Sequence, residues 1–265
     1  MRQRLEAVLS SLPACAVAVS GGVDSMTLAV IAHRLLGSAR VAIMHAVSPA
    51  VPAEATERVR LAAEREGWDL RILDAGEFAD DNYLRNPVNR CFFCKGNLYG
   101  AITRISDRQV LSGANTDDLG EYRPGLDAAR NHQVRHPYLE ADIDKQGVRA
   151  LARELGLGDI AELPASPCLS SRVETSIAIE PQTLRAIHAI ERLIDVELKP
   201  QTVRCRVRRT GVVIELDPQS LARMEAAKGT ELSDAITALL PARLAGGAIN
   251  FEAYRNGSAF VGVKQ

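Results

Sequence analysis

The chain has 265 residues, of which 46% are hydrophobic and 25% charged, with a formal net charge of -1 and an isoelectric point of about 6.5. This composition is typical of a globular protein, and near-neutrality argues against a dedicated nucleic-acid binder, which usually carries a strongly basic face. No apolar run approaches the roughly 20 residues of a membrane span, and residues 1–13 lack the apolar core of a secretory signal. We therefore expect a cytoplasmic protein whose five cysteines serve metal binding, catalysis or packing rather than disulfides.

Apolar runs and helical patterns alternate through the first part of the chain. The strands are short continuous apolar runs, as expected when both faces of a sheet are buried. Strands are predicted over 15–19, 40–47, 69–73 and 109–111, and helices over 3–12, 26–36, 53–67 and 94–104. This alternation predicts an α/β fold with a doubly wound, mainly parallel, Rossmann-like sheet.

The pattern changes after about residue 168. Helices are predicted over 181–194 and 218–228, and strands over 203–207, 212–216 and 248–263 with a turn at Asn256-Gly257. Because these elements indicate an α+β arrangement, we predict two domains. Residues 1–172 form a nucleotide-binding domain, and residues 173–265 form a smaller domain for substrate binding or oligomerisation.

A glycine-bearing segment, Ser20-Gly21-Gly22-Val-Asp-Ser25, joins the first strand to the following helix. Its glycines let the backbone approach a ligand closely, and the helix N-terminus directs N–H groups and a positive dipole at that ligand. The two serines add hydroxyl groups. The segment is not a Walker motif, because no Gly-Lys-Ser/Thr follows. It predicts a phosphate-binding loop, and a tight turn with a serine cap is the alternative.

A second polar loop, beginning at Ser112-Gly113, follows the fourth predicted strand. Adjacent carboxylates at Asp117 and Asp118 suit Mg²⁺, which prefers oxygen ligands. We assign Gly113 and Asp117 to the nucleotide site. Arg123, restricted by the proline after it, is a candidate for gripping released pyrophosphate. A polar loop with a helix cap is the alternative.

Three cysteines are candidates for a metal site. Cys91 and Cys94 form a C-x-x-C pair at the start of a predicted helix, and Cys168 lies in a proline-rich segment further on. Three thiolates suit a 4Fe-4S cluster with one open iron. Structural zinc would need a fourth ligand, for which His132 and His136 are candidates. A redox-active pair and a pair of core thiols also remain open.

Arginines alternate along the predicted strand at 203–207. Arg206 and Arg208 fall on one face, because side chains of a strand alternate with period two, and such a row can bind a phosphate bidentately. A solvated basic edge strand is the alternative. Cys205 points to the opposite face and Cys15 begins a core strand, so we expect both thiols to be structural.

The segment 20–25 resembles the signature of the PP-loop ATP pyrophosphatases. This superfamily includes GMP, NAD and argininosuccinate synthetases and several thiolation enzymes. The resemblance implies ATP binding, attack of an acceptor oxygen on the α-phosphate, and release of pyrophosphate. Asp24 would position Mg²⁺ and act in catalysis. In this superfamily the backbone at the end of the second strand contacts adenine. Ala46 and Ser48 are the candidates for that contact in this chain.

Several segments together resemble the LarE family of ATP-dependent sulfur transferases, over roughly residues 15–215. The matching segments are 20–25, 90–95, 113–125, 136–140, 148–152 and 164–172. The resemblance implies adenylylation of a carboxylate of pyridinium-3,5-biscarboxylic acid mononucleotide. Sulfur is then delivered to form a thiocarboxylate, a step in the biosynthesis of the nickel-pincer nucleotide cofactor.

Family members have two chemical forms. One form gives up the sulfur of a single cysteine matching Cys168, and the other holds a 4Fe-4S cluster on cysteines matching Cys91, Cys94 and Cys168. Because all three are present, the chain resembles the cluster form, whose cluster can be lost on aerobic isolation. Cys168 would be the catalytic residue for sulfur transfer.

The resemblance also bears on the substrate. Arg206 and Arg208 match an Arg-x-Arg grip on the substrate phosphate, and Glu191 is the candidate for the acidic residue on the preceding helix. The chain departs from the family by having Arg-Thr-Gly at 209–211 instead of His-His-Gly, which puts substrate identity in doubt. The implied partners are a nucleotide-type small molecule and further copies of the chain; no sulfide donor is indicated.

Three rival interpretations remain open at this point. A PP-loop tRNA thiolase would bind RNA tightly and salt-sensitively. A synthetase that uses ammonia would have no use for three thiols. A non-catalytic nucleotide- or zinc-binding protein would keep the loop without turnover.

Overall fold

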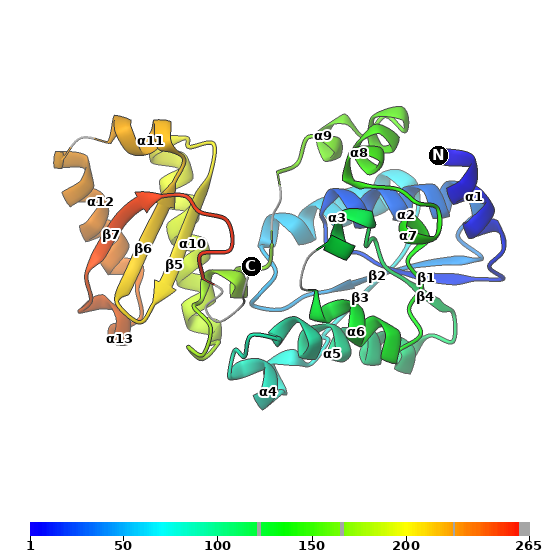
Figure 1. Cartoon of the computed structure of the whole chain (residues 1–265), viewed down its shortest axis with the longest axis horizontal. Helices are drawn as coiled ribbons and strands as arrows, with labels where there is room; N and C mark the ends of the chain where they lie inside the picture. The colour runs from blue at the N-terminus through cyan, green and yellow to red at the C-terminus, as the bar shows by residue number, and fades with distance from the viewer. Residues whose placement is uncertain (121–122, 165–166, 225, 260–265) are drawn as a thin grey trace. The chain divides into compact units, whose positions relative to one another are not determined.

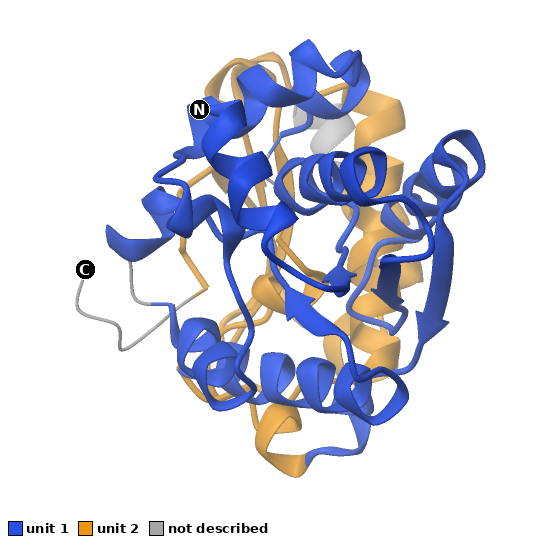
Figure 2. Ribbon diagram, turned by 90° about the vertical axis from the view of Figure 1, so that its right-hand side faces the viewer, with its two compact units in different colours: residues 1–80, 89–166 blue, residues 81–88, 167–265 orange. Residues whose placement is uncertain are grey.

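The computed structural model (Figure 1) describes residues 1–120, 123–164, 167–224 and 226–259. Parts of two motifs, at 121–122 and 165–166, lie outside the described residues, as does the end of the last predicted strand. The chain divides into two compact units, residues 1–80 with 89–166 and residues 81–88 with 167–265 (Figure 2). The domain division near residue 172 stays a prediction. No helix of the described residues is long and apolar enough to cross a membrane.

The first unit is built on a four-stranded parallel sheet in the order β3-β2-β1-β4. The strands are β1 (Cys15–Ala18), β2 (Val41–Ala46), β3 (Asp69–Leu73) and β4 (Gln109–Leu111). Val17 and Ile43 belong to the hydrophobic core on one face, whereas Ala16 and Met44 belong to the core on the other. Both faces are therefore covered, which explains the continuous apolar runs.

Helices cover the two faces of this sheet. On one side are α1 (Arg2–Ser10), α2 (Val23–Leu36), α3 (Ala53–Glu66), α7 (Pro137–Glu140), α8 (Lys145–Glu154) and α9 (Gly158–Ala161); on the other are α5 (Arg90–Ile105) and α6 (Pro124–Asn131) (Figure 1). Two short 3-10 helices come after the outer strands, η1 (Glu77–Ala79) after β3 and η2 (Thr116–Gly120) after β4. The predicted doubly wound α/β fold is confirmed.

The strand order identifies where a ligand site belongs. The chain adds β2 and β3 on one side of β1 and then β4 on the other, so the topological switch point lies between β1 and β4. Open α/β sheets bind ligands at the carboxyl ends of the strands at such a point. The segments that leave these two strands are residues 20–25 and 112–118, the two loops assigned to the nucleotide from sequence.

The second unit contains a mixed sheet in the order β5-β6-β7, with β5 antiparallel and β7 parallel to β6. Its strands are β5 (Val203–Arg208), β6 (Gly211–Leu216) and β7 (Ile249–Ala253). Its helical elements are α4 (Asp81–Leu84), η3 (Leu169–Arg172), α10 (Pro181–Leu198), α11 (Pro218–Arg223), α12 (Ala226–Leu239) and α13 (Ala242–Ala245). This confirms the predicted smaller α+β region.

One element prediction in this unit was wrong. The helix predicted over 218–228 ends at Arg223, because Met224 adopts an extended conformation with φ -75° and ψ 113°. In the last predicted stretch, the strand runs from Ile249 to Ala253 and the predicted turn at Asn256-Gly257 follows, with Gly257 at φ +68°.

Candidate active site

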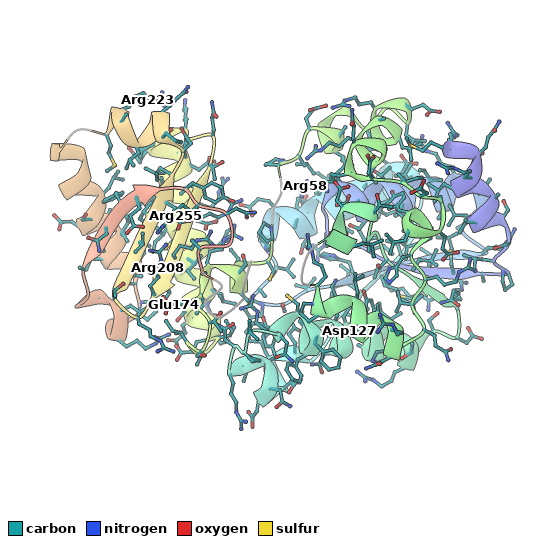
Figure 3. All side chains as sticks on the ribbon, viewed as in Figure 1. Arg58, Asp127, Glu174, Arg208, Arg223 and Arg255 are labelled. Carbon is teal, nitrogen blue, oxygen red and sulfur yellow. The ribbon has the colours of Figure 1, made fainter. Side chains whose placement is uncertain are left out.

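The first loop is shaped by Gly21. This residue has φ +82°, and a Cβ added there would lie 2.7 Å from the backbone oxygen of Ala55 on α3, so both conformation and space require glycine. Arg58, also on α3 and labelled in Figure 3, donates from Nη1 to the carbonyl oxygen of Gly21 at 2.8 Å. Helix α3 therefore holds the loop in its bend and brings a guanidinium group to it.

The two serines close the loop internally. The backbone N–H of Ser20 donates to the Oγ of Ser25 at 3.1 Å, and that hydroxyl donates to the carbonyl oxygen of Gly22 at 3.2 Å. Gly22 is the N-cap of α2 and supplies no side chain for capping. No serine side chain therefore caps α2, and the serine hydroxyls bond to the backbone of the turn instead. The N–H groups of the first helical turn have no intrahelical acceptor, so they are suited to bind phosphate oxygens.

Asp24 lies at the centre of a polar cluster in the first turn of α2. Its Oδ1 accepts from the side-chain amide of Asn115 at 3.1 Å, and its Oδ2 pairs with the ammonium group of Lys145. The hydroxyl of Tyr138 donates to its backbone oxygen at 3.0 Å. Burial, together with the Asp24 charge, raises the pKa of Tyr138 well above its usual value, so this phenol stays a donor. Nothing in the local sequence pattern singles out Asn115, Tyr138 or Lys145 for this cluster.

The acidic loop packs directly on the first loop. A Cβ added at Gly113 would lie 2.9 Å from the carbonyl carbon of Asp24 and 2.9 Å from the nitrogen of Ser25. Asp118 turns inward, where it accepts from the N–H of Asn115 at 3.0 Å and pairs with Arg123 at 3.0 Å. Asp117 is exposed instead. Of the two adjacent carboxylates, one thus organises the loop and the other faces solvent.

Replacing Gly113 by alanine is expected to weaken both folding and nucleotide binding. The added methyl group meets backbone atoms that cannot rotate away, so we expect a loss of about 1–3 kcal/mol in the free energy of unfolding. The measurement is denaturant unfolding together with ATP titration. Gly96→Ala is the matched control, because a Cβ there meets nothing within 4 Å. Equal effects of the two changes would contradict the close approach of the loops.

At the end of β2, the predicted adenine-reading residues Ala46 and Ser48 are both half-buried. The neighbouring His45 is buried and bridges three elements, with Nδ1 2.8 Å from the carbonyl oxygen of Val19 and Nε2 2.9 Å from Oγ1 of Thr56. A carbonyl only accepts, so Nδ1 donates to it and Nε2 accepts from threonine. Burial lowers the pKa of His45, which is consistent with this neutral form.

The C-x-x-C pair occupies the first turn of α5, which begins earlier than predicted, at Arg90. Cys91 is exposed and Cys94 is half-buried. A Cβ added at Gly125, at the start of α6, would lie 3.7 Å from the carbonyl oxygen of Cys91. The thiol-bearing turn therefore lies against the segment that continues from the acidic loop.

The histidines considered as zinc ligands have other surroundings. His136 is 2.7 Å from the Oγ of Ser112 through Nδ1, and burial lowers its pKa. The ring of His132 lies 6.2 Å from that of Tyr99. Within the described ranges, no three His, Cys, Asp or Glu side chains are arranged to hold a metal ion. Neither histidine therefore joins Cys91 and Cys94 in a group of that kind.

Cys168 belongs to the second unit and is exposed. Its loop is held by Arg172, whose Nη1 donates to the carbonyl oxygens of Pro167 at 2.6 Å and Cys168 at 3.3 Å. The same buried guanidinium forks onto the carboxylate of Glu191 on α10, at 3.0 and 3.1 Å. Glu191 also accepts the N–H of Cys205 at 2.9 Å. Glu191 is thus the ion-pair partner of Arg172.

The arginine row of β5 is joined to one buried carboxylate. Glu215 of β6 is fully buried and accepts from Arg206 at 2.9 Å and from Arg208 at 2.7 Å. Arg208, labelled in Figure 3, also reaches Glu252 of β7 at 3.2 Å. Its Nε is buried and has no hydrogen-bond partner among the described residues. Two guanidinium groups therefore share one buried acid, and Arg208 has a second carboxylate in Glu252.

Replacing Glu215 by glutamine is expected to destabilise the protein by about 3–5 kcal/mol, the cost of leaving a buried charge without its partner. The amide has one oxygen for two guanidinium groups, and its NH₂ would face an arginine donor. Denaturant unfolding measures the loss. Glu252→Gln is the control, because its side chain is 40% exposed and its ion pair contributes about 0–1 kcal/mol. A loss of unfolding free energy smaller than that of Glu252→Gln would show that Glu215 does not anchor Arg206 and Arg208.

The fold and the meeting of the two loops define a PP-loop α/β protein, in the class of ATP-using enzymes that carry this loop. No family model matches the chain. An uncharacterised protein of Synechocystis is 35% identical over 223 residues, which are 83% of this chain and 82% of that protein. A glutamine-hydrolysing GMP synthase component of Methanopyrus kandleri is 26% identical over 204 residues, 69% of this chain and 63% of that protein.

The pyridinium-3,5-bisthiocarboxylic acid mononucleotide synthase of Lactiplantibacillus plantarum is 31% identical over 216 residues, 80% of this chain and 78% of that protein. At this identity and coverage the chain belongs to the LarE family, the family of that synthase. The family resemblance predicted from the sequence motifs is confirmed.

Proposed function

We propose that the chain is an ATP-dependent sulfur transferase of nickel-pincer nucleotide cofactor biosynthesis. It adenylylates a carboxylate of pyridinium-3,5-biscarboxylic acid mononucleotide and delivers sulfur to form the thiocarboxylate. The observation that supports this most is the junction of the two loops at Asp24, in a chain 31% identical to a synthase named for the corresponding product.

In this proposal the first unit binds ATP. The backbone N–H groups of Ser20–Ser25 bind the pyrophosphate part, helped by the positive end of α2. Asp24 and Asp117 would hold Mg²⁺, for which carboxylate oxygens are suitable ligands. Ala46 and Ser48 contact adenine, and Arg123 binds the departing pyrophosphate. Gly113 is required because its backbone lies against Asp24.

The first chemical step is the transfer of AMP. A carboxylate oxygen of the substrate forms a bond to the α-phosphorus, the bond from that phosphorus to the bridging oxygen of the β-phosphate breaks, and pyrophosphate leaves with the electron pair. Binding both reactants on one protein supplies much of the rate by proximity. Fixed N–H dipoles and cationic side chains stabilise the charge that develops on pyrophosphate.

Arg206 and Arg208 bind the phosphate of the mononucleotide. Their shared strand face supports this role, because two guanidinium groups on one face can bind a phosphate through several N–H groups. Glu191 contributes by holding Arg172 and the Cys168 loop.

Cysteine thiolates are the ligands that a 4Fe-4S cluster uses, and three candidates are present. Cys91 and Cys94 lie three residues apart on one helical turn, which places them on the same side, and Cys91 and Cys168 are exposed. These three residues would hold the cluster, and when bound it offers an open iron that carries an extra sulfide for transfer. Iron and acid-labile sulfide analysis of anaerobically prepared protein tests this; zinc in place of iron would contradict it.

The test of the whole proposal is acceptor-dependent pyrophosphate release by anaerobically prepared protein. We expect release with ATP, Mg²⁺ and pyridinium-3,5-biscarboxylic acid mononucleotide, and a thiocarboxylate product by mass spectrometry when sulfide is supplied. Release with unmodified tRNA instead would identify a tRNA thiolase, and no release with either acceptor would favour a non-catalytic nucleotide-binding protein. The homo-oligomer and the cytoplasmic location stay predictions.

A further inference from the structure

Lys145 brings a third chain segment to the two loops. It is the first residue of α8, whose N-cap Asp144 accepts the N–H of Gly147 at 2.7 Å. The residue before that cap, Ile143, accepts the N–H of Thr116 from the acidic loop at 3.0 Å. These contacts fix the start of α8 beside the nucleotide site, so that the ammonium group of Lys145 reaches Oδ2 of Asp24.

The position of this ammonium group conflicts with the role proposed for Asp24. Oδ1 is engaged by the amide of Asn115 and Oδ2 by Lys145, so both carboxylate oxygens have a partner. Lys145 compensates the charge of Asp24 in this state of the protein. Once the Asp24 carboxylate ligates a divalent cation, the ammonium group of Lys145 needs another anionic partner. The polyphosphate of the nucleotide would be the nearest such group.

A lysine at position 145 suits an exchange of partner from a carboxylate to a phosphate oxygen. The chain has 32 lysines and arginines, but only five are lysines. An arginine here would fork onto both oxygens of Asp24 and hold the carboxylate in a fixed bidentate pair. A lysine ammonium is a compact charge on a flexible stem with three rotatable donors, so it can move from a carboxylate to a phosphate oxygen.

We propose that Lys145 is a phosphate-binding residue whose ammonium group exchanges Asp24 for the β,γ-phosphate oxygens when Mg·ATP binds. This inference rests on the ATP binding of the proposed function. Lys145 and Arg58 then supply cationic groups from α8 and α3 to the loop between them.

The first test is equilibrium binding of Mg·α,β-methylene-ATP, which cannot be cleaved at the reacting bond, measured by calorimetry. We expect Lys145→Met to weaken binding about 10- to 100-fold, the effect of losing one charge-assisted hydrogen bond. Binding of AMP, which lacks the β- and γ-phosphates, should change less than about twofold.

Lys145→Arg should keep the charge but raise the Mg²⁺ concentration needed for half-maximal binding. Arg153→Met is the control, because it removes an exposed charge from the same helix.

The second test uses the unaltered protein and does not depend on the folding of a variant. With lysine side chains labelled by ¹³C and ¹⁵N, the Lys145 signal is one of five, and it should shift on addition of Mg·α,β-methylene-ATP but not of AMP. If the protein binds the analogue while Lys145→Met binds it equally well, or while the Lys145 signal stays in place, the inference is wrong and the proposed function stands. If the unaltered protein does not bind the analogue, both fail.

Discussion

Replacing Asp24 by alanine is expected to lower the rate of acceptor-dependent pyrophosphate release by about 10²–10³-fold, the usual cost of removing one preorganised electrostatic contact from a transition state. The carboxylate is the only charged side chain of the first loop, and it lies in the segment that leaves β1 beside the topological switch point. Its loss removes the proposed Mg²⁺ ligand. Rates are measured by a coupled pyrophosphate assay at saturating ATP.

Two further variants separate chemistry from folding. Asp24→Asn keeps the shape of the side chain and can still accept from Asn115, so it should fold well but show a comparable loss of rate. Asp127→Asn, at an exposed aspartate of the first turn of α6 that pairs with Arg130 at 3.0 Å, should be neutral (Figure 3). Pyrophosphate release that survives Asp24→Ala at the normal rate would refute the adenylylation scheme.

Replacing Cys168 by serine is expected to abolish formation of the thiocarboxylate while pyrophosphate release continues. The thiol is exposed, and its loop is held through backbone carbonyls by Arg172, so the loop should keep its conformation without the sulfur. A serine hydroxyl is a much poorer ligand than thiolate for a 4Fe-4S cluster, and it supplies no sulfur. We therefore expect the acyl-adenylate to form and then hydrolyse, with at least about a 10³-fold loss of sulfur product, as when a nucleophile is removed.

The matched control is Cys205→Ala in the neighbouring strand. Cys205 is buried, and burial raises the pKa of its thiol, so it is not available as a nucleophile. This variant should lose some stability through the cavity it leaves but retain sulfur transfer. Sulfur product from Cys168→Ser would overturn the sulfur assignment without affecting the adenylylation proposal. If Cys91→Ser and Cys94→Ser both retained full activity, the single-cysteine chemistry would be favoured over the cluster.

The part of the site predicted from sequence is the part built from contiguous residues. The loop at 20–25 was identified from glycine and serine between a strand and a helix, and Gly21 does adopt the positive φ that favours glycine. The strands of the first unit were located to within two residues, because burial on both faces makes them continuous apolar runs. The wrong helix over 218–228 contains no proline or glycine after Pro218, so nothing local marked its end at Arg223.

Local patterns and contiguous motifs in the chain were enough to predict the sheet type and the family. Which distant side chains complete the candidate site depends on how whole elements pack. Lys145 meets Asp24 across 121 positions, and Asp118 rather than Asp117 turns inward. Glu215 reaches both Arg206 and Arg208, although the β5–β6 register sets it opposite Arg204. Such pairings carry no local signal, since an ion pair needs only proximity in space, and proximity follows from the packing of whole elements.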